Sequence, residues 1–148
     1  MIRLPPPVWL LVYLALCSAV SWALGWPTIP LLPMKSLGLL LIIIGVSLPA
    51  WGIFLFRQEQ TEVNPTSVAN RALVTGGPYR FTRNPMYLGL TIVAVGCVLW
   101  IGSWPMVAAP AALFLTANAI HIPFEEAKMR RQFPTEFARY EARVRRWL

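Results

Sequence analysis

Four long apolar segments stand out in the pattern of hydrophobic and polar positions along this 148-residue chain. They cover about residues 8–26, 36–56, 85–102 and 104–122, and none of them contains Lys, Arg, Asp or Glu. A transmembrane helix needs about 20 mostly apolar residues, within a range of roughly 17–25, so each segment is long enough to cross a bilayer. The pattern therefore predicts an all-α integral membrane protein with about four transmembrane helices.

The polar positions define the rest of the expected organisation. A short corner at Gly102 and Ser103 separates the last two segments, which predicts an antiparallel helical hairpin. A long polar loop covers residues 57–84, and a polar tail covers residues 123–148. We therefore expect a single membrane domain over residues 1–148, with its polar site built by the loop and the tail.

The first apolar segment also has features of a secretory signal peptide. Arg3 precedes it, and small residues gather toward its end, between Ser18 and Ala23. The apolar core of a signal peptide typically has about 7–15 residues, and this segment is longer. We therefore expect a transmembrane helix here.

Composition agrees with a membrane protein and excludes several soluble classes. Hydrophobic residues make up 57% of the chain and charged residues 13%, against roughly 45–50% and 25% in an average soluble domain. So much apolar surface excludes a disordered chain. A net charge of +7 is common in nucleic-acid-binding proteins, but seven Trp among long apolar runs argue against that class. Cys17 and Cys97 lie inside apolar segments, so we expect neither a disulfide framework nor a metal site.

The basic residues are distributed asymmetrically, which predicts an orientation. With four spans, the N-terminus, the 57–84 loop and the tail share one side of the membrane, and that side carries 12 of the 13 basic residues. Only Lys35 falls on the other side. The positive-inside rule places the basic side in the cytoplasm. All six acidic residues are there too, so we expect a multi-pass protein of a bacterial inner membrane whose termini and polar chemistry are cytoplasmic.

The 57–84 loop has the composition of an ordered segment, because its second half combines β-formers, aromatic residues and a Gly-Gly-Pro turn. It ends with Asn84, a favoured N-cap residue, and Pro85, a favoured first helical residue, so the third span should begin there. The N-terminus of that helix, flanked by Arg80 and Arg83, is suited to a carboxylate or phosphate. The alternative is a capped helix end that the arginines anchor at the membrane surface.

Two polar residues lie at or just beyond the end of the fourth apolar segment. His121 and Glu125 are spaced i, i+4 and therefore lie on one helix face. A polar side chain at the membrane boundary is costly unless it faces the protein interior, so both are candidates for a functional role. The alternative is a hydrogen-bonded pair at the interface.

The end of the tail has the spacing of an amphipathic helix. Apolar residues recur at steps of four, three, four and three, at Phe133, Phe137, Tyr140, Val144 and Trp147. Arginines occupy the other positions. Such a helix lies on an anionic membrane surface or packs back over the loop as a lid.

Two motif blocks resemble a known family. The first is the continuous run 73–89, and the second comprises His121, Glu125, Glu126, Phe133, Tyr140, Arg143 and Val144. In this order and spacing they resemble the isoprenylcysteine carboxyl methyltransferases, a family of small integral membrane methyltransferases whose wider relatives include phospholipid N-methyltransferases. The resemblance extends from Asn64 to the end of the chain, whereas the first two apolar segments match only in being apolar.

This resemblance implies that S-adenosylmethionine binds at the cytoplasmic side and that a lipophilic acceptor enters from the membrane. The positions that match the family's cofactor contacts are Asn64, Arg71, Ala72, Leu73, Val74, Tyr79, Asn84, Pro85, Met86, Tyr87 and Glu125. His121 and Arg83 are the expected catalytic residues. His121 matches a position that handles the acceptor and is Arg in eukaryotic members, and Asn84 stands where many members have His.

The residue types agree with methyl transfer from a sulfonium. This in-line displacement needs alignment and exclusion of water rather than a metal or a covalent intermediate. We expect the cofactor's carboxylate near Arg83 and the start of the third span, and its sulfonium or amine near Glu125. We expect its adenine on Leu73, Val74 and Tyr79.

The residues are compatible with several classes of methyl acceptor. A prenylcysteine-like carboxylate is already ionised at neutral pH and needs a cationic partner, such as Arg83 or a protonated His121. A phospholipid amine or a small thiol needs a base, which a neutral His121 could provide. A non-enzymatic small transporter or assembly protein is the alternative from another class, although no span carries an ionisable residue in its middle.

Overall fold

The computed structural model describes residues 5–61 and 70–148, and this part of the chain is mostly helical. The helices are α1 (Pro6–Ala23), α2 (Lys35–Gln58), α3 (Pro85–Ile101), α4 (Ala108–Thr116), α5 (Ile122–Gln132) and α6 (Pro134–Glu141). Short 3-10 turns at Gly77–Arg80 and Trp104–Val107 precede α3 and α4. A π-helical turn at Ala117–His121 joins α4 and α5 into one continuous helix. The prediction of an all-α membrane protein is confirmed.

Three helical segments are long and apolar enough to cross a membrane, namely α1, α2 and the run Trp104–Gln132, and α3 is a shorter apolar helix. The first three predicted segments agree with helix boundaries to within a few residues. The helix that contains the fourth predicted segment continues beyond residue 122, to Gln132. The extra residues are mostly Glu, Ala, Lys, Met and Arg, which are strong helix formers and extend a helix that already exists.

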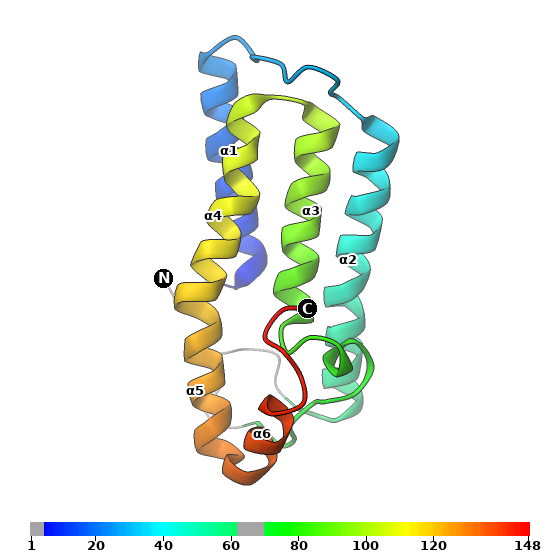
Figure 1. The fold of residues 1–148 in the computed structure, drawn as a ribbon, viewed down its shortest axis with the longest axis vertical. Helices are drawn as coiled ribbons and strands as arrows, with labels where there is room; N and C mark the ends of the chain where they lie inside the picture. The colour runs from blue at the N-terminus through cyan, green and yellow to red at the C-terminus, as the bar shows by residue number, and fades with distance from the viewer. Residues whose placement is uncertain (1–4, 62–69) are drawn as a thin grey trace.

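The long helices run in alternating directions along the bundle (Figure 1). α3 lies between α2 on one side and α4 on the other, and α1 packs beside α4. The loops from α1 to α2 and from α3 to α4 lie together at one end, whereas the start of α3, α6 and the C-terminus lie at the other. The predicted hairpin of the last two apolar segments is therefore present, with Gly102 in the left-handed conformation (φ 72°) at its corner.

Glycines bring the backbones of α2 and α3 into direct contact. Gly38 and Gly45 lie seven residues apart on α2, and Gly96 and Gly89 face them from α3. A Cβ atom at Gly45 would lie 2.7 Å from the carbonyl oxygen of Gly89, and one at Gly38 would lie 2.8 Å from that of Gly96. Small residues at such positions let membrane helices pack closely where no hydrophobic effect drives them together.

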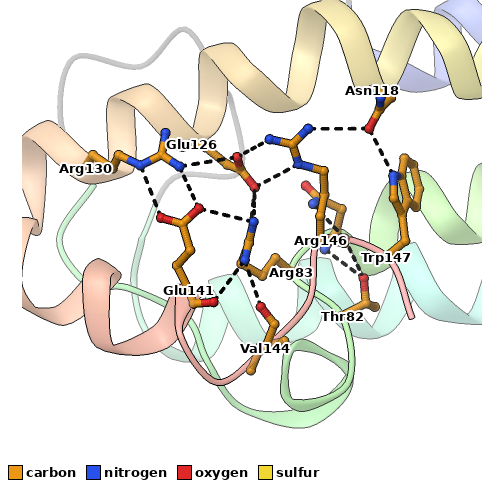
Figure 2. A network of polar contacts seen from close by, with 10 residues as sticks. Thr82, Arg83, Asn118, Glu126, Arg130, Glu141, Val144, Arg146 and Trp147 are labelled. Atoms are coloured by element: carbon orange, nitrogen blue, oxygen red, sulfur yellow. Dashed lines mark hydrogen bonds and ion pairs between the residues drawn. The ribbon is translucent and has the colours of Figure 1, made fainter.

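A buried ion network joins the C-terminal tail to the bundle (Figure 2). Glu126 of α5 is at its centre, with a side chain only 5% exposed. One carboxylate oxygen lies 2.9 Å from Nη2 of Arg83, and the other lies 2.7 Å from Nη2 of Arg146. Arg130 lies 3.8 Å from Glu126 and 2.6 Å from Glu141. A buried carboxylate is therefore balanced by arginines from three separate segments.

The segment before α3 also binds backbone carbonyls of the tail. Arg83 donates from Nη1 to the carbonyl oxygens of Val144 (2.8 Å) and Glu141 (3.2 Å). The Thr82 hydroxyl and the Asn84 amide both donate to the Arg146 carbonyl, at 3.0 and 2.9 Å. These bonds satisfy the carbonyl of Glu141, at the end of α6, and two carbonyls of the tail beyond it.

The predicted amphipathic helix is only partly correct. α6 contains Phe137 and Tyr140, which are buried against Val74 and Tyr79 of the loop. The helix therefore packs back over the loop. The helix ends at Glu141 and does not continue through Val144 and Trp147 as predicted. The carbonyls beyond Glu141 are bound by Arg83, Thr82 and Asn84, which turns the chain back toward α4.

After this change of direction, the chain places Trp147 beside α4. Its indole ring lies 4.7 Å from the ring of Phe114 on α4, measured between centroids. Its Nε1 donates to the side-chain oxygen of Asn118 at 3.1 Å. Trp147 therefore packs in a different apolar cluster from Phe137 and Tyr140 and does not extend the apolar face of α6.

The glycine contacts predict an unequal response to the same substitution. Gly45→Ala should lower the free energy of unfolding by about 1–3 kcal/mol, because its methyl group meets backbone atoms of α3. Gly52→Ala is the matched control on the same helix, because the nearest atom there, Met86 Cγ at 3.1 Å, belongs to a flexible side chain. Thermal denaturation in detergent measures both. Equal midpoints for the two variants would contradict this account of α2–α3 packing.

The ion network predicts a second stability difference. Glu126→Ala should destabilise the protein by about 3–5 kcal/mol, because it removes the carboxylate that pairs with the guanidinium of Arg83, whose side chain is only 10% exposed. It should also speed hydrogen exchange at the Arg83 amide, which donates to the Arg145 carbonyl of the tail at 2.9 Å and loses that acceptor when the tail undocks. Glu136→Ala removes an exposed carboxylate from α6 and serves as the control. Unchanged exchange in Glu126→Ala would mean that the network does not hold the tail.

Candidate functional site

A cavity of about 530 Å³ lies where the end of α2, the start of α3 and α5 meet under α6. Ligand pockets in proteins typically measure roughly 300–1,000 Å³, so this cavity is large enough for a cofactor-sized molecule. Its wall is mostly apolar and includes Ile53, Phe56, Leu90 and Phe137. Polar side chains are confined to the part of the wall made by the loop, the start of α3 and α5.

Most of the residues that the motif resemblance assigns to a cofactor line this one cavity. They are Ala72, Leu73, Val74, Tyr79, Asn84, Met86, Tyr87 and Glu125. Of the others, Arg71 is exposed and Pro85 is buried, and neither lines the cavity. Asn64 lies outside the described residues. Residues from the loop, α3 and α5 thus meet although up to 53 positions separate them in the sequence.

Tyr87 and Glu125 form the closest polar contact in the cavity wall. The Tyr87 hydroxyl donates to Oε1 of Glu125 at 2.6 Å, joining α3 to α5. Tyr87 is 4% exposed, so its orientation is fixed by packing as well as by this bond. A carboxylate held in a mostly apolar cavity favours a positively charged ligand group close to it.

His121 lies beside this pair but does not line the cavity. Its ring lies 6.0 Å from the ring of Tyr87 and 6.3 Å from that of Trp9, measured between centroids. It is 3% exposed, and its Nε2 has no hydrogen-bond partner within the described part of the chain. His121 therefore lies next to Tyr87, on the side away from the cavity, while Tyr87 bonds to Glu125.

A π-helical turn lies between α4 and α5, close to the residues that contact the tail and the cavity. It adds one residue to the turn Ala117–His121, immediately before the acidic residues. Asn118 faces the tail, where it binds Trp147, whereas Glu125 faces the cavity. Turns of this kind occur mostly as single insertions and often near functional sites.

Arg83 and Asn84 line the cavity but bind the tail. The guanidinium of Arg83 donates to Glu126 and to two tail carbonyls, and the side-chain nitrogen of Asn84 donates to the Arg146 carbonyl. Asn84 does occupy the N-cap position of α3, and Pro85 is its first residue, as predicted. The expected side-chain cap is wrong, because the Asn84 amide makes no bond to the first turn of α3.

Two tyrosines complete the cavity below α6. The Tyr140 hydroxyl donates to the carbonyl oxygen of Tyr79 at 2.8 Å, which ties α6 to the loop. Burial raises the pKa of both phenols above the ordinary value, and Glu125 raises that of Tyr79 further. Both side chains therefore stay neutral and form wall surface rather than charged groups.

Lys128 is a cavity residue that the sequence reasoning missed. It is 7% exposed, lines the cavity and lies close enough to Glu125 to interact with its charge. Its position three residues after Glu125 places both on one face of α5, which is the signal that could have identified it.

Comparison with known proteins gives three findings. A family model described as phospholipid methyltransferase matches residues 34–136, which is more than half of the chain. An uncharacterized protein of Haemophilus influenzae is 33% identical over 63 residues, covering 43% of this chain and all of that protein. No solved structure matches this chain.

The family match spans both motif blocks up to Glu136 and includes α2, α3, α4 and α5. The matched family belongs to the same group as the isoprenylcysteine carboxyl methyltransferases, so the resemblance drawn from the motifs is confirmed at that level. The match and the helical membrane fold together support a membrane methyltransferase. The chain belongs to the phospholipid methyltransferase family.

Proposed function

We propose that this protein transfers a methyl group from S-adenosylmethionine to a lipophilic acceptor at the cytoplasmic face of a bacterial inner membrane. The observation that carries the proposal is the gathering of eight expected cofactor residues, including Tyr87 and Glu125, around one cavity. Family membership supports the reaction class. The concentration of 12 of the 13 basic residues in the N-terminus, loop and tail supports the cytoplasmic side, with four spans.

The cavity's chemistry fits the proposed cofactor. S-adenosylmethionine would supply an electrophilic methyl group on a positively charged sulfur, together with an adenine and an amino-acid group. Leu73, Val74 and Tyr79 offer apolar and aromatic surface for the adenine. Glu125, oriented by Tyr87, offers negative charge for the sulfonium or the amine.

In this proposal the protein contributes alignment and exclusion of water. Phe137 and Tyr140 on α6 cover the cavity, and the Glu126 network keeps α6 in place through the tail. Arg83 acts mainly through that network, since its donors already have protein partners. A closed and oriented site is what a displacement at a sulfonium needs, because no group has to be activated by a metal or a covalent intermediate.

The cavity also extends toward the apolar part of the bundle. Pro49 and Ile53 of α2, Leu90 of α3 and Pro6 and Pro7 of α1 line this region. An acceptor with an alkyl chain could place the chain along these residues while its polar group reaches the Tyr87–Glu125 pair. This arrangement supports a lipophilic acceptor rather than a water-soluble one.

Two acceptor classes remain in the proposal. The description of the matched family favours a phospholipid amine, and the motif resemblance favours the carboxylate of a prenylcysteine-like compound. An amine, like a small thiol, has to lose a proton, which His121 could accept, whereas a carboxylate does not. His121 lies behind Tyr87, so its action as a base would require access to the acceptor through a small movement of that ring.

Cofactor binding is the first test. We expect the detergent-solubilised protein to bind S-adenosylmethionine in calorimetry, and Glu125→Ala and Tyr87→Ala each to weaken binding about 10-fold or more, as expected for a lost charged hydrogen bond. Glu136→Ala on the exposed face of α6 is the matched control and should bind like the wild type. No binding by the wild type would exclude the enzymatic proposal and favour a non-enzymatic membrane protein. Unchanged affinity in both cavity variants would exclude this site.

Transfer of a labelled methyl group identifies the acceptor. A total lipid extract and a prenylcysteine analogue are incubated separately with the protein and labelled S-adenosylmethionine. If the acceptor is an amine or a thiol, His121→Ala should lower kcat by about 10²–10⁴-fold, the usual contribution of general base catalysis. If it is a carboxylate, the same variant should change kcat much less. Label in neither acceptor would contradict both assignments.

A further inference from the structure

The polar residues of the cavity wall divide into two sets with different partners. Arg83, Asn84 and Glu126 bind one another or the C-terminal tail, at distances of 2.7–2.9 Å for their shortest contacts. The Tyr87 hydroxyl of α3 and the Glu125 carboxylate of α5 instead form a hydrogen bond with each other. The second set is therefore the one whose charge is directed at the cavity rather than at the protein's own tail.

Lys128 belongs with the second set by its position. It lies one helical turn after Glu125 on the same face of α5 and lines the same cavity. Lys128 and Glu125 therefore contribute opposite charges to the wall of one cavity. At 7% exposure Lys128 is among the most buried charged residues of the described chain, and lysine is rarely buried without a specific electrostatic partner.

We propose that Lys128 binds the carboxylate of the methyl donor's amino-acid group, while Glu125 binds its ammonium or sulfonium. This inference rests on the proposed function and specifies how the cavity recognises the donor. An α-amino acid carries opposite charges on groups attached to one carbon, and the Glu125–Lys128 pair offers the complementary charges from one helix face. Arg83, the basic residue that the sequence suggested for the carboxylate, already donates to Glu126 and Val144.

The proposal predicts selectivity for the carboxylate. The wild type should bind S-adenosylmethionine about 10- to 100-fold more tightly than decarboxylated S-adenosylmethionine, the range expected for one hydrogen bond between charged groups. In Lys128→Met that ratio of affinities should fall to near one, because only the donor with a carboxylate loses a partner. Lys128→Arg should restore part of the ratio. Calorimetry on the detergent-solubilised full chain measures all the affinities.

Arg131→Met is the matched control, because Arg131 is an exposed basic residue on the same helix. It should keep the wild-type ratio. If Lys128→Met is too unstable to measure, Lys128→Gln removes the charge while keeping a polar end, and the same fall in the ratio is expected.

Several results would overturn the inference. A ratio that is unchanged in Lys128→Met, or near one in the wild type, would show that Lys128 does not recognise the carboxylate although the protein binds the donor. A raised KM for the acceptor with an unchanged donor ratio would assign Lys128 to an anionic acceptor group instead. A wild type that binds neither donor would overturn the proposed function together with this inference.

Discussion

The buried carboxylate of Glu126 is the interaction on which the cavity end of the molecule depends. It meets Arg83 from the start of α3 and Arg146 from the tail, and α5 supplies Glu126 itself. A buried carboxylate without such partners would be strongly destabilising, so the three segments are constrained to meet. Once they meet, Arg83 also binds the carbonyls that follow α6, and the short α6 is held over the loop. The cavity exists because this cover is fixed.

The close contact of α2 and α3 has a different role. Gly38, Gly45, Gly89 and Gly96 allow the two backbones to touch, which orients the end of α2 relative to the start of α3. Ile53 and Phe56 of α2 therefore line the same cavity as Met86 and Tyr87 of α3. The apolar bundle thus supplies rigid walls, and the polar segments beyond it supply the charged groups. This division agrees with the demands of methyl transfer to a lipophilic acceptor, which needs a lipid-accessible wall and a charged corner for the donor.

Much of the fold could be predicted from the sequence because hydropathy is a local property. The apolar segments predicted α1, α2 and α3 to within a few residues, and Pro85 and Gly102 fixed the start of α3 and the corner after it. The last apolar segment ends at about residue 122 while its helix continues to Gln132, since hydropathy marks where a span loses its apolar character and not where helical hydrogen bonding stops. The length of α6 was overestimated from the sequence. The spacing continued to Trp147, but hydrogen bonds from distant residues to the tail carbonyls ended the helix earlier.

The sequence by itself determined that this is a helical membrane protein and that its polar residues gather in the loop and tail, and it proposed eleven cofactor positions, eight of which line the cavity. Only the tertiary structure decided which partner each polar or charged side chain has. Arg83 and Asn84 bind the tail, Glu126 holds the arginines, and Glu125 faces the cavity with Tyr87 and Lys128. Adjacent residues such as Glu125 and Glu126 have the same local pattern and chemistry. Their different partners follow from helix phase and from long-range contacts, which no local pattern contains.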